Sequence, residues 1–265
     1  MEKGIEVKEE AFECFTPDGV SIRGLVFRSG EKRGMVILAH GFPQPQRPKE
    51  DPEDEGYPGL ARRLCAEGFD AAIFNFRGTG ESGGHLELEK WPDDLSTVMD
   101  YLGGGGFAVA GFSAGGAAAI LQSAKDERIR LLVCMASPAD FHFLQVDDEP
   151  EDWFEQYRRA GMIGEDYPGD AKSWTAGVEG VVPREVIGMS LAEQIVIVHG
   201  TEDESVPVAH AETLARAAGP KARKVLVEGA SHRLRQDDRA VEVLIDQLRR
   251  FAGVFSRFKT SRQTS

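Results

Sequence analysis

Cysteine is scarce in this chain, which contains only Cys14, Cys65 and Cys134 among its 265 residues. No two of them have the Cys-x-x-Cys spacing that zinc sites and redox-active dithiols share. An odd number of widely separated cysteines also argues against a disulfide framework. We therefore expect three buried thiols and no metal site built on cysteine.

A hydrophobic run of the about 20 residues needed to cross a bilayer is also missing. The most apolar segment, residues 107–121, is shorter and is interrupted by Gly111, Ser113, Gly115 and Gly116. Positions 2–10 are mostly Lys and Glu, so they lack the apolar core of a signal peptide. These absences predict a cytoplasmic protein without a membrane partner.

Positive charge is in the minority, because 31 Lys and Arg residues face 44 Asp and Glu residues, for a net charge of −13. Such a chain repels phosphate backbones, so we expect no nucleic-acid partner. A content of 41% hydrophobic and 28% charged residues is typical of a globular protein with a sizeable core.

Short apolar runs predict the strands. An antiparallel hairpin is expected first, because residues 12–15 and 20–27 flank the turn sequence Thr16-Pro17-Asp18-Gly19. The later runs are continuously apolar, which is typical of parallel strands covered on both faces. These runs are residues 35–39, 71–76, 107–110, 131–135, 195–198 and 224–227.

Helical periodicity separates most of these runs. Apolar side chains share one face in three sets: Leu60, Leu64 and Cys65; Leu95, Val98, Met99 and Leu102; and Val241, Leu244, Ile245, Leu248 and Phe251. Alternating strands and helices predict the α/β class, with a mostly parallel, doubly wound sheet of about eight strands behind the antiparallel hairpin.

Two segments interrupt this alternation. Residues 43–56 combine four prolines with a cluster of acidic residues, which predicts a solvated insertion. The stretch between the runs at 131–135 and 195–198 is too long for an ordinary connection and holds several aromatic residues. It predicts a small helical subdomain. The polar tail, residues 259–265, is expected to be disordered.

The main candidate nucleophile is Ser113, in Gly111-Phe112-Ser113-Ala114-Gly115-Gly116. This segment joins an expected strand to a helix-compatible run, and a sharp turn of that kind exposes a serine hydroxyl. The helix start also places backbone N–H groups beside a developing oxyanion. The ordinary alternative is a close-packed turn of small residues, but the strand and helix on either side favour the nucleophile.

A serine nucleophile needs a histidine base and an acid that orients it. Among the histidines, His232 follows the last expected strand, at the sheet edge where ligand chemistry gathers. His40 and His199 each end a strand before glycine, and we expect them to orient turns by hydrogen bonds. His85 is expected in a polar loop and His210 in a surface helix.

Three adjacent carboxylates, Glu202, Asp203 and Glu204, compete for the role of the acid. Composition does not choose between them, although a solvated face is the more common fate of such glutamates. Arg77 poses a similar choice between anchoring a substrate and joining loops by ion pairs, and the second reading is favoured.

Five motifs in this order resemble the α/β-hydrolase superfamily, and the resemblance covers the chain from Phe12 to about Phe255. They are His40-Gly41-Phe42, the turn Asn75–Ser82, the segment Gly111–Gly116, the acid loop His199–Pro207 and Gly229-Ala230-Ser231-His232. The resemblance implies Ser113 as nucleophile, His232 as general base and Asp203 as its orienting acid. It also implies an oxyanion hole formed by the backbone N–H groups of Phe42 and Ala114.

Within the superfamily, the chain looks most like small intracellular acyl hydrolases such as cinnamoyl and feruloyl esterases and monoacylglycerol-lipase-like enzymes. The resemblance implies a hydrolase core over residues 1–138 and 191–258, with a cap inserted at 139–190. The acidic insertion departs from the family pattern. Because it directly follows Phe42, we expect it to influence how a substrate reaches the site.

The expected activity is that of a serine carboxylic-ester hydrolase acting on a small acyl or aryl ester through an acyl-enzyme, with no metal or organic cofactor. Trp153, Tyr157 and Trp174 of the cap are candidate walls of the substrate pocket, unless they only hold the cap in place. A thioesterase, an amidase or a small-peptide aminopeptidase with the same triad is the main alternative. A catalytically silent binding protein is the second alternative, although all three triad members are present.

Overall fold

An eight-stranded mixed sheet forms the centre of the molecule, with strand order β1-β2-β4-β3-β5-β6-β7-β8. The computed structural model describes residues 7–31, 33–43, 56–146 and 148–255. The strands are β1 (Lys8–Phe15), β2 (Ser21–Arg28), β3 (Met35–Ala39), β4 (Asp70–Phe74), β5 (Phe107–Phe112), β6 (Ile129–Met135), β7 (Gln194–Gly200) and β8 (Ala222–Val227). Strand β2 runs antiparallel to both of its neighbours, and all other pairs are parallel. The predicted hairpin and parallel sheet are therefore confirmed.

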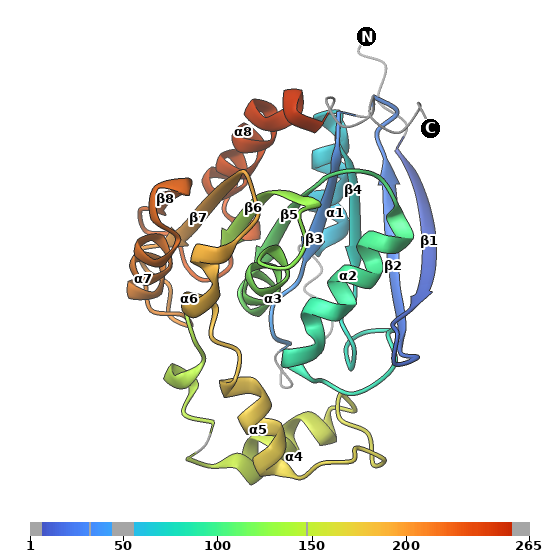
Figure 1. Ribbon diagram of the computed structural model, residues 1–265, viewed down its shortest axis with the longest axis vertical. Coiled ribbons are helices and arrows are strands. Elements are labelled where there is room, and N and C mark those ends of the chain that lie inside the picture. Colours follow the sequence, from blue (N-terminus) through green and yellow to red (C-terminus); the bar gives the residue numbers. More distant parts are fainter. Residues whose placement is uncertain (1–6, 32, 44–55, 147, 256–265) are drawn as a thin grey trace.

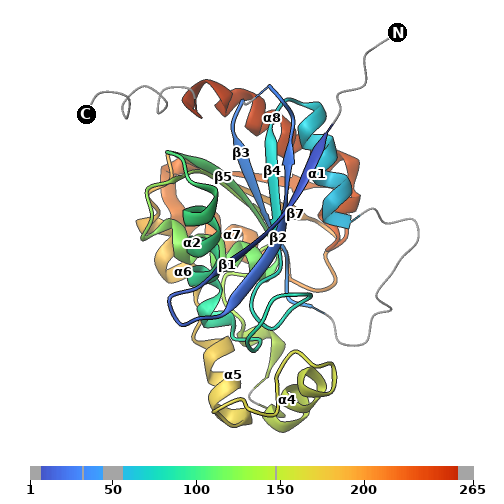
Figure 2. The same cartoon turned by 90° about the vertical axis from the view of Figure 1, so that its right-hand side faces the viewer.

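Helices cover both faces of the sheet. The α-helices are α1 (Gly56–Ala66), α2 (Trp91–Leu102), α3 (Ala114–Ser123), α4 (Pro150–Arg159), α5 (Ala171–Glu179), α6 (Pro183–Val186), α7 (Ala209–Ala218) and α8 (Asp238–Phe255), with 3-10 turns at Leu88–Lys90, His142–Leu144, Ile187–Met189, Gly219–Lys221 and Leu234–Gln236. Figure 2 views the sheet nearly edge-on, with α1 and α8 on one side and α2, α6 and α7 on the other. Each side has its own cluster of buried apolar side chains.

Several strands begin or end at other residues than expected, and two of these differences bear on the site. The run predicted to end at Phe76 leaves the sheet after Phe74, because the Phe76 amide donates to the imidazole of His40. Strand β5 continues to Phe112, which pairs with Met135 of β6, so the sheet runs directly up to Ser113.

Helices α4 and α5 lie beyond the carboxyl end of β3, away from the sheet (Figure 1). They are still attached to the core, because the buried ring of Trp174 donates its indole N–H to the carbonyl of Leu86 at 2.6 Å. Their apolar side chains belong to the same buried cluster as those of α2 and α3. The expected helical segment is thus present, and its limits at 139 and 190 stay a prediction.

Arg77 joins the β1–β2 turn to α2. Its guanidinium is 1% exposed and lies 2.8 Å from the buried carboxylate of Asp94 and 2.9 Å from Asp18. Hydrogen bonds from Arg77 lower the pKa of Asp18 to about 2. The reading of Arg77 as a residue that joins loops by ion pairs is therefore confirmed.

Two predicted features, the solvated insertion inside 43–56 and the disordered tail 259–265, lie outside the described residues. Within the ranges that the structure describes, no helix is long and apolar enough to span a bilayer.

The three cysteines should be unreactive in the folded protein. All are buried free thiols, and burial raises the pKa of Cys14 and of Cys65 to about 11 and that of Cys134 further. Because the thiolate is the reactive form, Ellman's reagent at about pH 8 should label the native chain far more slowly than the chain in guanidinium, where all three thiols react. Rapid labelling of any native thiol would contradict this packing.

Candidate active site

Ser113 lies in a strained turn between β5 and α3. Its backbone has φ 51° and ψ −123°, a conformation that costs a non-glycine residue about 1–3 kcal/mol. The turn is tight enough to require glycine on both sides. A Cβ at Gly111 would lie 2.5 Å from the Cα of Gly116, and one at Gly115 would overlap the carbonyl of His40.

The segment after β3 passes directly beside this serine. A Cβ at Gly41 would lie only 2.9 Å from the Cβ of Ser113 and 3.5 Å from its Oγ. The next residue is Phe42, and Ala114 begins α3 on the other side of Ser113. The two backbone N–H groups named as the oxyanion hole therefore come from segments that meet at Ser113, and their role stays a prediction.

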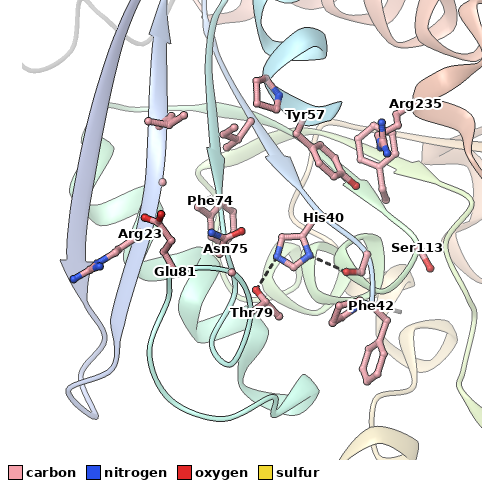
Figure 3. Close-up of a pocket in the computed structure, with 18 of the residues that line it drawn as sticks. Arg23, His40, Phe42, Tyr57, Phe74, Asn75, Thr79, Glu81, Ser113 and Arg235 are labelled. Atoms are coloured by element: carbon pink, nitrogen blue, oxygen red, sulfur yellow. Dashed lines mark hydrogen bonds between the residues drawn. The ribbon is translucent and has the colours of Figure 1, made fainter. Parts of the chain in front are cut away.

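His40 controls the orientation of the peptide that carries the Phe42 N–H. Its Nε2 accepts the Phe76 amide at 3.1 Å, so the proton resides on Nδ1 and is donated to the Gly41 carbonyl at 2.8 Å (Figure 3). In a trans peptide the carbonyl and the following N–H point in opposite directions. Burial lowers the pKa of His40 to about 4, which keeps this donor neutral. The expectation that His40 orients a turn is confirmed.

Asp203 and His232 are joined by a hydrogen bond beyond the end of β7. The imidazole Nδ1 lies 2.8 Å and 3.0 Å from the two carboxylate oxygens. The amides of Ser205 and Val206 also donate to Oδ1, at 2.9 and 2.7 Å. The Asp203 side chain is fully buried, whereas that of His232 is 19% exposed.

The environment of Asp203 favours its ionised form. Burial alone would raise the pKa of this carboxyl, but hydrogen bonds from two imidazoles and the Val206 amide outweigh burial and lower the pKa well below its usual value. The imidazoles are those of His199 and His232.

The neighbouring glutamates do not reach the imidazole ring. Glu202 is exposed, and the carboxylate of Glu204 accepts the backbone N–H of His232 at 3.2 Å. Of the three carboxylates that the sequence left open, only Asp203 lies against the ring. Two further histidines accept backbone amides. His85, in a loop, accepts the amide of Gly164, and His210, partly buried on α7, accepts the amide of Ala139.

Ser113 and His232 face the same cavity, which has a volume of about 1050 Å³. The two side chains share no hydrogen bond in the described part of the chain, and such contacts commonly tighten only when substrate binds. Other lining residues come from β1, β2, the segment after β3, the end of β4, the turn after it, the start of α1, the end of β5 and the residues after His232. Figure 3 shows Tyr57 and Arg235 side by side above Ser113, with the arginine 5.3 Å from the ring centre.

The lining includes residues that the sequence did not single out, among them Leu25, Ile73 and Tyr57. Leu25 and Ile73 are paired across β2 and β4, so only the sheet register brings them to one wall. Tyr57 directly follows the acidic insertion. An aromatic residue at that position was the one feature of the sequence that could have indicated a lining residue.

The three aromatic residues proposed as pocket walls lie behind Phe42. The Tyr157 ring meets that of Phe42 edge-on at 5.1 Å, and its hydroxyl donates to the Pro43 carbonyl at 3.1 Å. Trp153 stacks on Tyr157, which confirms that they share a helix face, and Trp174 packs against both Tyr157 and Phe42. None of the three is among the described residues that line the cavity.

No group of three or more metal-ligating side chains converges anywhere in the described ranges.

Asp203→Asn should lower the free energy of unfolding by an amount that depends on pH. The folded-state pKa of Asp203 is lowered from its ordinary value of 3.8, so the stabilisation is complete above that pH and is lost as the pH falls towards the folded pKa. Urea unfolding of both proteins between about pH 7 and 3 should show the two energies converging in acid. Glu202→Gln is the control, since its exposed carboxylate should produce no convergence. A pH-independent gap for Asp203→Asn would contradict a stabilised, ionised Asp203 carboxylate.

Solved structures with the same architecture include two esterases. The Pyrococcus furiosus esterase Pf2001 has a TM-score of 0.68 at 19% identity, over 94% of both chains. The Exiguobacterium antarcticum esterase EaEST has a TM-score of 0.68 at 17% identity, over 89% of this chain and 98% of that one. A puromycin-hydrolyzing peptidase of Mycobacterium tuberculosis gives 0.68 at 20% identity, over 96% of this chain and 40% of that one. At these identities the likeness establishes the fold alone.

No curated protein matches the sequence. The sequence does match the family described as alpha/beta hydrolase fold, over residues 34–176. This range is more than half of the 265 residues and includes the Ser113 turn, and the chain therefore belongs to the alpha/beta hydrolase fold family.

Proposed function

We propose that this protein is a serine hydrolase that cleaves carboxylic esters through an acyl-enzyme, with Ser113, His232 and Asp203 as its triad. The observation that supports this most directly is that a strained, partly buried serine and an imidazole held by a buried carboxylate face one cavity. That combination is the general arrangement for activating a hydroxyl.

In the first half-reaction, Ser113 Oγ attacks the ester carbonyl while Nε2 of His232 accepts the hydroxyl proton. The carbonyl oxygen becomes an oxyanion that the backbone N–H groups of Phe42 and Ala114 stabilise. When the tetrahedral intermediate collapses, the C–O bond to the alcohol breaks and His232 returns the proton to the leaving alkoxide. Asp203 stabilises the imidazolium between these two transfers.

In the second half-reaction, His232 takes a proton from water, and the resulting hydroxide attacks the acyl group on Ser113. The second tetrahedral intermediate then releases the carboxylic acid, and the proton returns to the serine oxygen. No redox step occurs. The serine proton leaves with the alcohol in the first half-reaction and a proton from water replaces it in the second, so the complete cycle restores the enzyme.

A small acyl or aryl ester is the proposed substrate, as in the cinnamoyl and feruloyl esterase-like and monoacylglycerol-lipase-like hydrolases that the sequence resembles. The two esterases of similar fold support this choice. The peptidase of similar fold keeps an amide or small-peptide substrate as the second candidate. In either case we propose that residues 139–190 act as a cap that supports Phe42 from behind, through Tyr157 and Trp174.

Ser113→Ala should abolish ester turnover and leave the fold intact, because losing the nucleophile of a triad lowers the rate by several orders of magnitude. The measurement is p-nitrophenyl acetate hydrolysis together with labelling by a fluorophosphonate probe, which needs an activated serine. Ser231→Ala is the matched control, since Ser231 is an exposed serine beside His232. Retention of more than about a tenth of the activity in purified Ser113→Ala would refute the mechanism.

The position of the acyl pocket can be tested with paired substitutions. Leu25→Trp adds bulk to the wall of the cavity, so we expect the ratio of kcat/KM for decanoate over butyrate esters to fall more than about fivefold. Leu226→Trp is the control, because Leu226 is an exposed leucine on β8. A substitution of a ring that only packs the cap, such as Trp174→Ala, should lower stability and slow all esters alike.

The opposite pattern would place the acyl pocket under the cap, where the sequence predicted it. In that case at least one of Trp153→Ala, Tyr157→Ala and Trp174→Ala would change the ester ratio more than about fivefold, and Leu25→Trp would leave it unchanged.

A further inference from the structure

His199 is a fully buried residue that none of the proposed reaction steps uses. It lies at the end of β7, next to Gly200. Its Nε2 is 2.9 Å from the carbonyl oxygen of Val206 and 3.1 Å from Oδ2 of Asp203. Its Nδ1 has no hydrogen-bond partner in the part of the chain that the structure describes.

These contacts determine the protonation state of the ring. Both neighbours of Nε2 are acceptors, so Nε2 carries the proton and shares it between Val206 and Asp203. A second proton on Nδ1 would bury an unpaired N–H together with a positive charge, which is costly. His199 is therefore a neutral donor, and it adds a hydrogen bond to Asp203 without adding a charge.

The carboxylate of Asp203 is held unevenly by the backbone. The amides of Ser205 and Val206 both donate to Oδ1, whereas no backbone N–H of the described residues donates to Oδ2. Rotation about the Cβ–Cγ bond, a torsion with a broad energy minimum, moves both oxygens together, and on the Oδ2 side only the two imidazoles oppose it. Oδ2 is the oxygen nearest to His232, at 2.8 Å, and it is also the oxygen that His199 contacts.

We propose that His199 is a positioning residue: its Nε2–H holds Oδ2 of Asp203 in the orientation that aligns His232. The proposal rests on the proposed function, because it is the triad whose acid His199 orients. The same proton also binds the carbonyl of Val206, so the imidazole joins the strand end, the acid and the far side of the acid loop.

A matched pair of variants separates the hydrogen bond from the bulk of the ring. Gln and Met have similar length and volume, but only the Gln side chain can donate from about the position of Nε2. In His199→Met we expect kcat for p-nitrophenyl acetate, per fluorophosphonate-titratable site, to fall about tenfold to a hundredfold, with KM within about twofold. In His199→Gln we expect kcat to return to within about fivefold of the unmodified chain.

Proton NMR provides a readout that a purely structural role would not change. The Nδ1 proton between His232 and Asp203 should give a far-downfield resonance when His232 is protonated. That resonance should shift upfield or broaden in His199→Met and return in His199→Gln. On the unmodified protein, nitrogen-15 shifts should show His199 protonated on Nε2 and bare on Nδ1.

Three results would overturn the proposal: kcat within twofold of the unmodified chain in His199→Met, equal loss in the Met and Gln variants, or an unchanged downfield resonance. If His199→Met does not fold, the nitrogen-15 shifts of His199 in the unmodified protein test the proposal instead. A proton on Nδ1 would then refute it. Failure of the proposed function is a separate outcome, since an unmodified chain that no fluorophosphonate labels would refute it while the resonances still test His199.

Discussion

Parallel pairing from β3 through β8 is the constraint on which the site depends. Each of these strands runs in the same direction, so their carboxyl ends meet at one edge of the sheet. His40 follows β3, Ser113 follows β5, Asp203 follows β7 and His232 follows β8. Residues far apart in the sequence thus become neighbours, and the exact approach is then set by glycines that let one backbone pass close to another.

Two neutral imidazoles, one partly and one fully buried, support this edge with opposite tautomers. His40 carries its proton on Nδ1 and directs it to the Gly41 carbonyl, which orients the peptide leading to Phe42. His199 carries its proton on Nε2 and directs it to the acid loop. Each ring donates its proton to an oxygen that would otherwise need water as its partner. The Nδ1 of His199 is left without a partner among the described residues.

The aromatic residues of α4 and α5 have a place in this arrangement that differs from a simple pocket wall. They pack on the side of Phe42 remote from the cavity lining, and two of them are tied down by hydrogen bonds to the Leu86 and Pro43 carbonyls. Phe42 therefore stands between helices α4 and α5 and the cavity, and the packing of these helices bears directly on the segment beside Ser113. The cavity itself extends over the β2 and β4 end of the sheet.

The amino-acid sequence by itself determined the class of fold and two members of the site. Continuous apolar runs, helical stripes and the small residues around Ser113 are local patterns, and each follows from the conformation of a few neighbouring residues. The position of His232 after the last strand could likewise be predicted from the sequence. Composition left three carboxylates open, and the family resemblance implied Asp203. The tertiary structure supplies the physical reason, because only this side chain of the three lies against the imidazole while Glu204 accepts a backbone amide.

The cavity wall and the second donor to Asp203 also needed the folded chain. Leu25 lies opposite Ile73 through strand register, and His199 meets Asp203 because the acid loop folds back over the end of β7. Such contacts join positions whose spacing has no period, so no local pattern reports them. What the sequence can specify is which conformation each segment prefers, whereas the distance between segments is decided by how they pack.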